Sequence, residues 1–370
     1  PIELNNGAHL LLTLSGNNQL TSKNTTDVKG APAIKVIDSS QLTIRGEGSL
    51  TCTGGGISAG IGGTVSGDGT PLNCGDIIIE SGTITAKGGN SSLGCGAGIG
   101  GGGLLSYEGD GGDITIHGGK VTAIGGSVGS GALFAPGIGA GIAPTASATV
   151  PGYSRVGGGG TLTMTGGTLE ADAGSASSKY GDIGGYTNTE IHISGGSLFL
   201  KNEKYNKATF KDSSSTLIYR VKVDGSDCPK DTDIECSYNG GAKFKAQTID
   251  GYFYFWLPTT APNPYTLIFS RAGLDDILKY GGSVIANHND NTAPIKVVSS
   301  SSGKEYDTLK KAFDAESSGS TLTLKQSISL AEAITTSKTL TLNLNGKKIT
   351  EYSGGKRWVT QSGGTLTLTG

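Results

Sequence analysis

The sequence contains few of the residues that build most catalytic and metal-binding sites. Four histidines, five cysteines and two tryptophans occur in 370 residues, and neither a Cys-x-x-Cys pair nor a cysteine–histidine cluster with zinc spacing is present. No apolar run reaches the roughly 18 residues that span a bilayer. The net charge of −2 provides no basic surface for nucleic acid. We therefore expect no metal, no cofactor, no nucleic-acid partner and no membrane insertion of this segment.

Glycine is abundant instead, with 64 residues against an average of about 7% of a chain. It does not recur at every third position, which excludes collagen, and the apolar residues between the glycines argue against disorder. One pattern repeats: a strand, a glycine turn, a second strand, a glycine-rich loop and an Ala-Gly-Ile-Gly-Gly element. The strand pairs lie at 42–44 and 50–52, 77–79 and 84–86, 114–116 and 121–123, 162–164 and 169–171, and 191–193 and 198–200. The third element lies at 59–63, 97–101, 140–142 and 181–185, and a degenerate first copy uses 12–14, 20 and 33–34.

The irregular length of the repeat favours a solenoid, because extra residues leave each coil as loops. Three short strands per copy close one triangular coil, and residues 1–203 are predicted to form an all-β, right-handed parallel β-helix. Stacking then places equivalent residues in inward columns, such as Ile44, Ile79, Ile116, Met164 and Ile193. A second column contains Cys52, Ala86, Ala123 and Ala171, which predicts that Cys52 is a small buried filler with an unreactive thiol. Cys95 is expected to point inward in line with Ile57 and Ile138.

Two further regions follow the predicted β-helix. Residues 204–292 contain β-rich, aromatic stretches without the glycine repeat and are predicted to form a small antiparallel β module. Within it, we expect Phe253 and Phe255 to be core. The opposite face of that strand is either a platform for a sugar or a contact with the β-helix, and we favour the contact. Residues 293–370 are predicted to form the helix-capped start of a second β-helix, because Leu309, Ala312 and Phe313 have helical spacing before further period-2 runs. Both chain ends are expected to be cuts from a longer protein, and spacing alone leaves open whether Cys228 and Cys236 form a disulfide.

Several of these segments resemble a known group of proteins. The Ser-Gly-Gly-Thr-Leu-Thr-Leu-Thr stretch at 362–369, the Ala-Gly-Ile-Gly-Gly elements and Leu-Asn-Leu-Asn-Gly-Lys-Lys-Ile-Thr at 342–350 resemble Gly-rich, pectin-lyase-like β-helix surface proteins of gut Firmicutes. The resemblance covers residues 10–203 and 295–370. It implies an extracellular protein of a Gram-positive cell surface, of the adhesin or carbohydrate-binding-domain type. Some surface proteins of this bacterial group bind host immunoglobulins, and no catalytic motif of the family maps onto this sequence.

An enzymatic alternative has to be weighed, since polysaccharide lyases and hydrolases also use β-helices. Glycoside hydrolysis needs two carboxyl groups that flank the scissile bond, and loop carboxylates are available at Asp68, Glu108, Asp110, Asp113 and Asp182. Asp76 and Asp113 precede equivalent strands and would stack about 4.8 Å apart. An aspartate between a glycine and a strand is also an ordinary turn residue, which is the interpretation we favour. His117 and His192 are expected to be solvated residues of the outer face.

Binding residues are sought in the loops, because aromatics form only 6% of the chain and tyrosine and arginine are favoured at interfaces. Stacked loops are predicted to bring together Tyr107, Glu108, Phe134, Tyr153, Arg155, Tyr180 and Tyr186. The alternative is that Leu133 and Phe134 form a small satellite core. The sequence thus predicts a monomeric, non-enzymatic adhesin that binds a host glycoprotein, immunoglobulin or glycan on the flank of the β-helix. A carbohydrate-active enzyme is the first alternative, and a structural stalk is the second.

Overall fold

The computed structural model describes most of the chain. The described residues are 1–23, 30–66, 68–129, 133–144, 156–174, 178–202, 205–225, 228, 230–238, 241–258, 265–271, 274–280, 294–295, 297–306, 309–325, 327–330, 334–350 and 359–370. They divide into two compact units, each with its own buried apolar cluster. Unit 1 contains Pro1–Ile234, Phe244–Thr259 and Ala286–Asn289, and unit 2 contains Glu235–Lys243, Thr260–Ile285 and Asp290–Gly370. Within the described residues, no helix is both long and apolar enough to cross a membrane.

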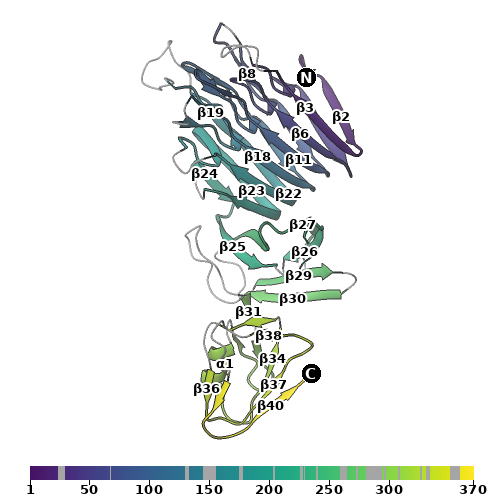
Figure 1. The fold of residues 1–370 in the computed structure, drawn as a ribbon, viewed down its shortest axis with the longest axis vertical. Helices are drawn as coiled ribbons and strands as arrows, with labels where there is room; N and C mark the ends of the chain where they lie inside the picture. Colours follow the sequence, from purple (N-terminus) through teal and green to yellow (C-terminus); the bar gives the residue numbers. More distant parts are fainter. Residues whose placement is uncertain are drawn as a thin grey trace. The chain divides into compact units, whose positions relative to one another are not determined.

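Unit 1 is dominated by a sheet of 16 strands, eleven of which follow one parallel, nearly closed path (Figure 1). Its strands stack in three ladders, in which each strand pairs in parallel with the corresponding strand of the next repeat. Ladder A contains β2 (His9–Leu14), β5 (Gln41–Gly46), β10 (Asp76–Ile79), β17 (Asp113–Ile116), the first part of β22 (Gly158–Asp172), the middle of β23 (Ile183–Leu200) and β24 (Tyr205–Lys211). Ladder B contains β3 (Asn17–Thr21), β6 (Ser49–Thr53), β11 (Thr83–Lys87), β18 (Lys120–Ile124) and the ends of β22 and β23. Ladder C contains β1 (Ile2–Leu4), β4 (Ile34–Val36), β7 (Ile61–Gly62), β14 (Ile99–Gly100), β21 (Ile138–Gly139) and the start of β23.

The register of ladders A and B confirms the predicted inward columns. In ladder A, Ile79 pairs with Ile44 and Ile116, and Met164 pairs with Ile116 and Ile193. In ladder B, Cys52 opposes Ala86, followed by Ala123 and Ala171. The period-2 alternation of each strand turns these residues to the interior, where they form the main apolar cluster. The Cys52 side chain is fully buried, and burial raises the pKa of its thiol to about 12, as expected for an unreactive filler.

Ladder C is built on an Ile-Gly pair in each repeat, and here one predicted alignment is wrong. The third repeat contributes Ile138 and Gly139, which pair with Ile99 and Gly100, rather than Ile142. The sequence offers two similar tripeptides four residues apart, Gly-Ile-Gly and Gly-Ile-Ala, and the backbone decides between them. Gly139 has φ +135°, and a Cβ there would lie 2.0 Å from the Gly184 carbonyl oxygen. Only glycine can therefore occupy this position. If Gly-Ile-Ala formed the strand instead, its alanine would stand here and clash.

The displaced Ile142 belongs to a satellite cluster outside the main core. It forms an antiparallel bridge with Cys95, and both are buried with Ala135, Ala140 and Tyr180. The prediction that Cys95 points into the main core in line with Ile57 and Ile138 is therefore wrong. Cys95 is buried as expected, but in the cluster that lies beneath the loops. Burial raises the pKa of its thiol to about 12.

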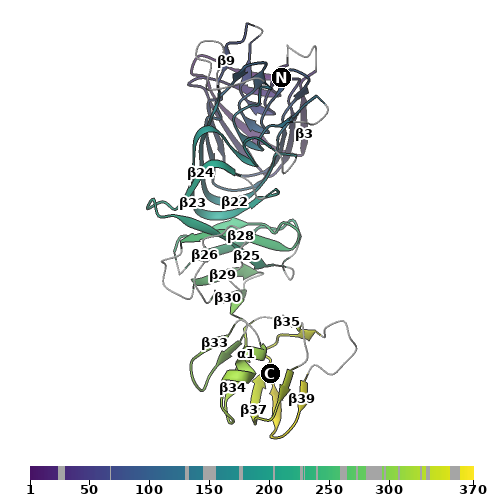
Figure 2. The ribbon, with the colours of Figure 1, turned by 90° about the vertical axis from the view of Figure 1, so that its left-hand side faces the viewer.

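An antiparallel pair covers the last strands of unit 1 (Figure 2). It consists of β25 (Ile218–Asp224) and β28 (Tyr252–Pro258). Phe253 and Phe255 are buried side by side with centroids 5.5 Å apart. The opposite face of β28 contacts the large sheet: Trp256 Nε1 donates to the Leu198 carbonyl oxygen at 3.1 Å, and the Trp256 ring stacks on Phe210 at 4.0 Å. Both the core prediction and the contact prediction for this strand are confirmed. A short strand, β27 (Phe244–Ala246), also packs on β22 and β23.

Unit 2 begins with antiparallel strands and continues with a small parallel arrangement. The antiparallel strands are β26 (Ile234–Tyr238), β29 (Tyr265–Arg271), β30 (Leu274–Tyr280) and β31 (Pro294–Ile295). The second part contains β32 (Val297–Ser299), β33 (Glu305–Tyr306), α1 (Leu309–Ala315), β34 (Thr321–Leu324), β35 (Ile328–Ser329), β36 (Ile334–Thr336), β37 (Leu340–Asn343), β38 (Ile349–Thr350), β39 (Val359–Gln361) and β40 (Leu366–Thr369). Parallel pairing joins β34 to β37 and β37 to β40, β35 to β38, and β36 to β39. Helix α1 buries Leu309, Ala312 and Phe313 in the core of this unit, which confirms the predicted helix.

Candidate functional site

Four short β-hairpins leave the stacked strands of unit 1, and we call them the flank hairpins. They are β8 (Thr64–Val65) with β9 (Pro71–Leu72), β12 (Asn90–Ser91) with β13 (Gly94–Cys95), β15 (Gly103–Leu104) with β16 (Tyr107–Glu108), and β19 (Ser127–Val128) with β20 (Leu133–Phe134). All four are antiparallel, and Figure 1 marks this region at β8 and β19. They carry Tyr107, Glu108 and Phe134 of the predicted binding residues.

Backbone contacts fix the flank hairpins to one another. Ser91 of β12 pairs in parallel with Val128 of β19. The Leu105 amide donates to the Leu93 carbonyl oxygen at 2.6 Å, which joins two hairpin tips. A Cβ at Gly94 would lie 1.9 Å from the Gly103 carbonyl oxygen, so the two backbones touch where side chains normally separate them. The hairpins therefore form one connected layer rather than four independent loops.

The tip of the β15–β16 hairpin has an unusual backbone. Leu104 pairs with Tyr107, so the loop consists of two residues, and its first residue, Leu105, has φ +52°. Two-residue loops with positive φ at this position favour glycine. The left-handed conformation costs a side-chain-bearing residue about 1–2 kcal/mol. Leu105 is also 46% exposed, so burial of its side chain does not offset this strain.

Tyr107 and Leu93 lie beside this tip and are half-buried. Both pack against a small apolar cluster of Ile57, Val65 and Leu104. The Tyr107 ring lies over Gly69 in the β8–β9 loop, where a Cβ would be 2.8 Å from its Cε2. Next to Gly69, the exposed Asp68 accepts hydrogen bonds from the Ser66 hydroxyl and, at 2.9 Å, from the Thr70 amide. These bonds lower the pKa of Asp68 to about 2, so a fixed negative charge borders the apolar tip.

Glu108 lies directly behind the tip and has no exposed surface. Its carboxylate accepts hydrogen bonds from the Tyr180 hydroxyl at 2.6 Å and from Lys179 Nζ at 3.1 Å. The amides of Ala143 and Gly157 donate to its two oxygens at 3.2 and 3.1 Å. Burial and the adjacent carboxylate raise the pKa of Tyr180. Because four donors converge on one carboxylate, Glu108 holds three separate chain segments together.

The structure brings together only some of the predicted binding residues. Glu108 and Tyr180 are in direct contact, but both are buried. Tyr186 is half-buried and packs with Leu133 on the satellite cluster that contains Tyr180. Phe134 is half-buried, and a Cβ at Gly174 would lie 2.9 Å from its ring. Tyr153 and Arg155 lie outside the described residues. Leu105 and Lys179 were not among the predicted binding residues; the Leu-Leu-Ser-Tyr stretch at 104–107, which places a leucine in a polar loop, is the sequence signal for the first.

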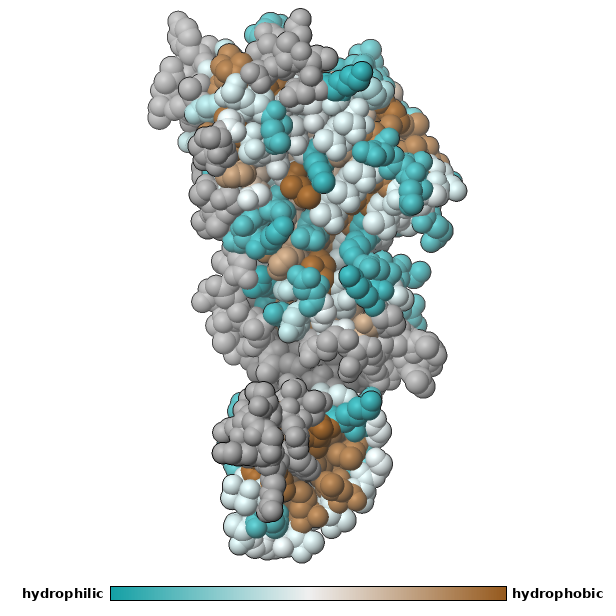
Figure 3. Space-filling model, viewed as in Figure 1, coloured by the Kyte–Doolittle hydropathy of each residue, from teal (hydrophilic) through white to brown (hydrophobic). Residues whose placement is uncertain are grey.

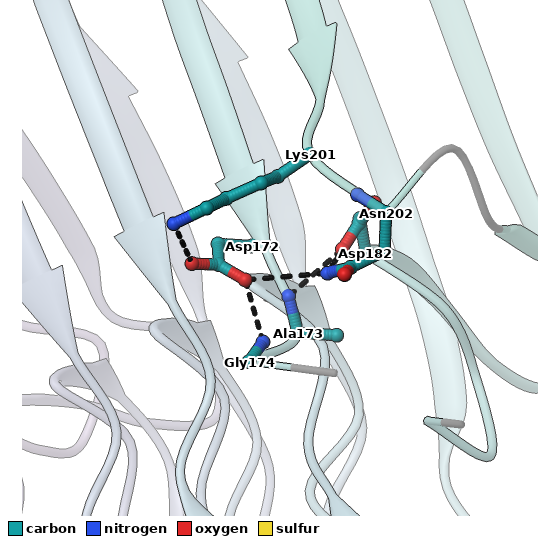
Figure 4. A network of polar contacts seen from close by, with 6 residues as sticks. All are labelled: Asp172, Ala173, Gly174, Asp182, Lys201 and Asn202. Carbon is teal, nitrogen blue, oxygen red and sulfur yellow. Dashed lines mark hydrogen bonds and ion pairs between the residues drawn. The ribbon is translucent and has the colours of Figure 1, made fainter. Parts of the chain in front are cut away.

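A second carboxylate network joins the ends of the turn between β22 and β23 (Figure 4). Asp182 is fully buried and accepts hydrogen bonds from the Ala173 amide at 2.8 Å and from the amide and side chain of Asn202 at 2.7 and 2.8 Å. Asp172 accepts from the Gly174 amide at 2.6 Å and from Lys201 Nζ at 2.7 Å. Asp110 similarly accepts from the Gly158 amide at 2.8 Å. These carboxylates act as structural acceptors for backbone amides.

The outward face of ladder A carries the remaining residues that the sequence singled out. The register places Asp76 and Asp113 on adjacent strands, as predicted, and both are exposed. His117 Nδ1 lies 2.7 Å from the Thr165 hydroxyl. His192 Nε2 lies 3.2 Å from Glu190 Oε2, a partner two residues away that the sequence pattern did not indicate. Among the described residues, no group of three or more His, Cys, Asp and Glu side chains is arranged to hold a metal ion.

The outward face of ladder B contains a carboxyl group in an unusual environment. Glu170 is half-buried between Thr122 and Phe199 of the neighbouring strands. Its pKa is raised, chiefly by burial, with Asp172 contributing and Lys201 opposing. Elsewhere this face carries stacked threonines at positions 51, 85 and 122. In Figure 3 the surface over the parallel strands is mostly pale, with separate hydrophilic and hydrophobic side chains.

Comparisons with family models, with curated proteins and with solved structures give no match for this chain. Its function is therefore inferred from the residues of unit 1. Two arrangements there could serve a function. One is the exposed apolar tip of the flank hairpins, bordered by Asp68, and the other is the half-buried Glu170 beside Asp172. The first suits binding, and the second is the carboxyl pair closest to an acid–base arrangement.

Proposed function

We propose that this chain is a non-enzymatic binding protein of a bacterial cell surface, an adhesin for a host ligand. The ligand is a glycoprotein, an immunoglobulin or a glycan, and it is bound by the flank hairpins. We further propose that the stacked strands of unit 1 form a right-handed parallel β-helix that serves as the scaffold. The supporting observation is the register, in which equivalent residues of successive repeats oppose one another in three parallel ladders.

One observation carries the binding proposal: the layer of flank hairpins holds an exposed leucine and a half-buried tyrosine on a fixed backbone. Leu105 lies in a two-residue loop, its amide donates to the Leu93 carbonyl oxygen, and Tyr107 follows at the start of β16. A rigid loop loses little conformational entropy when a ligand binds, which favours affinity. Function also concentrates on loops that a rigid scaffold positions. The layer therefore supports recognition better than it supports a purely structural stalk.

The carboxylates of the flank support a binding role over a catalytic one. Glu108 and Asp182 are buried and saturated with hydrogen-bond donors. A general acid or nucleophile has to reach the substrate, and a carboxylate that is enclosed by backbone amides does not. Asp68 is exposed, but its hydrogen bonds serve its own loop. Four of the five sequence candidates for glycoside hydrolysis accept hydrogen bonds from backbone amides, namely Asp68, Glu108, Asp110 and Asp182, which favours a role in holding loops in place.

The proposal is tested by immobilising the chain and measuring binding of glycoproteins from mucosal secretions, in parallel with a glycan array. We expect saturable binding in at least one of the two, weakened at least tenfold by Tyr107→Ala. Leu11→Ala is the matched control, because Leu11 is 51% exposed on β2, away from the flank hairpins. Binding that Tyr107→Ala leaves unchanged would move the site elsewhere. An absence of binding in both assays would favour the stalk.

A carbohydrate-active enzyme is the second candidate, and Glu170 is the observation that favours it. A half-buried carboxyl with a raised pKa can act as a general acid. A second carboxylate, Asp172, lies two residues away on the same strand, where it is buried and paired with Lys201. The Cα atoms of residues two apart on one strand are about 6.8 Å apart, which leaves their carboxyl groups room to reach the separation of about 6.5–9.5 Å that inverting glycosidases use. Polysaccharide cleavage that is lost in Glu170→Gln and retained in Asp68→Asn would replace the binding proposal with this one.

A further inference from the structure

Leu105 stands apart from every other described residue with a left-handed backbone. Six further non-glycine residues have positive φ, and all are polar and short: Asn6, Asp38, Ser215, Asp231, Asp250 and Asn345. Such side chains are commonly found in this conformation, whereas a leucine is an outlier. Three other large apolar residues are as exposed as Leu105, namely Leu11, Leu217 and Leu368, but their backbones are unstrained. Among the residues that the structure describes, Leu105 alone combines the strained backbone with the exposed apolar side chain.

The surroundings of Leu105 hold it in this position. Its amide donates to the Leu93 carbonyl oxygen at 2.6 Å. Gly103, two residues earlier, lies so close to the Ile142 backbone that a Cβ would approach its carbonyl oxygen to 2.2 Å. Glu108 anchors the other end of the hairpin through four hydrogen bonds. Glycine would occupy the same loop without strain, so the leucine is kept at a cost to stability. Backbone strain that the surrounding structure maintains is typical of ligand-binding positions.

The chemistry of the tip indicates what it binds. A leucine side chain has no hydrogen-bonding group and no ring, so it offers little to a sugar, which is bound by polar groups and aromatic faces. Burying the leucine side chain in an apolar pocket, away from water, lowers the free energy of the complex. The half-buried Leu93 and Tyr107 extend the apolar surface around it. Asp68, the residue before the Gly69 that the Tyr107 ring covers, supplies one exposed negative charge, which complements a cationic side chain at the rim of the pocket.

We propose that Leu105 is the anchor residue of the flank hairpins and that it inserts into an apolar pocket of a protein partner, bordered by a lysine or arginine that faces Asp68. This inference depends on the proposed function and narrows its ligand from a host protein or glycan to a protein surface. Tyr107 and Leu93 form the rim of the contact. A central apolar anchor with a partly polar rim is the usual anatomy of a protein–protein interface.

The test uses the full chain and Leu105→Gly, which removes the side chain and relieves the backbone. The probe is a phage-displayed random peptide library selected on the full chain, in parallel with a glycan array. We expect the selected peptides to combine apolar residues with lysine or arginine and to bind Leu105→Gly at least tenfold more weakly. Leu11→Gly serves as the control for an exposed leucine and should bind them like the original chain. Leu105→Gly should unfold at the same or a higher temperature, which separates lost binding from lost folding.

Asp68→Asn is the second variant and should weaken the peptides that carry lysine or arginine by several-fold. Peptides that bind Leu105→Gly and the original chain equally would overturn the inference. Glycan binding that disappears in Leu105→Gly would overturn it as well, because the tip would then contact a sugar. Mucosal ligands that bind the chain regardless of Leu105 would end this inference and leave the proposed function standing. If the chain binds no mucosal ligand, the proposed function fails first.

Discussion

Glu108 is a charged residue without exposed surface, and its value to the fold depends on four donors from three segments. A buried carboxylate is tolerated only when hydrogen bonds and a counter-charge replace water. Lys179, whose side chain is 30% exposed, supplies the charge. The residue thus links the flank hairpins to the turn that contains Tyr180.

Replacing Glu108 with glutamine should lower the free energy of unfolding by about 3 kcal/mol. The neutral amide loses the ion pair with Lys179, and its NH2 group faces hydrogen-bond donors that now bind a carboxylate oxygen. The measurement is chemical denaturation followed by circular dichroism. Lys179→Met is the milder comparison, with an expected loss of about 1 kcal/mol, since its amine is partly solvated. Equal losses for the two variants would show that the backbone amides contribute little.

We expect Glu316 to make the stability of unit 2 sensitive to acid. It is buried and accepts hydrogen bonds from the hydroxyls of Ser302 and Tyr306, each at 2.5 Å, and of Ser320 at 3.0 Å. These bonds lower its pKa from 4.5 to about 2. A lowered folded-state pKa means that its contribution is complete above the unfolded value of about 4.5 and is lost as the pH falls toward 2.

We therefore expect Glu316→Gln to flatten the pH dependence of unit 2 stability between about pH 4.5 and pH 2. The measurement is the thermal midpoint of unit 2 across that window in the original chain and the variant. The original chain should lose more stability on acidification than the variant does. Parallel curves would assign the acid sensitivity to other groups.

At the scale of residues, the sequence predicted burial well and backbone conformation poorly. The columns through Ile79 and Cys52 follow from period-2 alternation, which is a property of side chains. The φ of Leu105 follows from the length of a two-residue loop and from contacts with Leu93, which are not local in sequence. The four partners of Glu108 were equally hidden, because they lie 35 to 72 positions away.

Among the elements, ladder C shows how backbone contact selects a sequence. Gly62, Gly100, Gly139 and Gly184 all have φ between +127° and +152°. At the first three, a Cβ would lie 2.0–2.3 Å from a carbonyl oxygen of the next repeat. The repeat of Ile-Gly in this ladder is therefore a steric requirement.

Gly139→Ala should destabilise unit 1 by at least about 2 kcal/mol, since its Cβ would meet the Gly184 carbonyl oxygen at 2.0 Å in a strained conformation. Gly129→Ala is the matched control: Gly129 also has positive φ, +54°, but no atom lies within 4 Å of its Cβ position. The control should lose only about 1 kcal/mol, the cost of the conformation alone. The free energies of unfolding are measured by denaturant titration. Similar losses for the two variants would attribute the effect to the positive φ instead of the steric clash.

Elements were predicted most successfully where one face is apolar throughout. Helix α1 and the ladder A and B strands have such faces, and their positions are confirmed. The alignment of ladder C failed at 138–142 because two glycine-containing tripeptides satisfy the same pattern. The flank hairpins have only two residues per strand, which is too short for any periodicity, so their pairing became visible only in three dimensions.

For the whole molecule, the two separate apolar clusters indicate two unfolding events. Trp256 belongs to the cluster of unit 1, and Phe313 belongs to that of unit 2. Calorimetry should resolve two transitions. Trp256→Ala, a loss of about 3–5 kcal/mol, should lower one midpoint by about 10 °C and leave the other unchanged, and Phe313→Ala should do the reverse. A single transition that both variants shift would show that the units unfold together.

The aromatic residues that cover the last strands of the large sheet also bear on aggregation at high protein concentration. An uncovered edge of a parallel sheet is a template on which extended chains polymerise. At this end Trp256 Nε1 occupies the Leu198 carbonyl oxygen and its ring stacks on Phe210, so the acceptor that an incoming strand would need is already used. The Trp256 side chain therefore both packs in the core and blocks the addition of further strands at this edge.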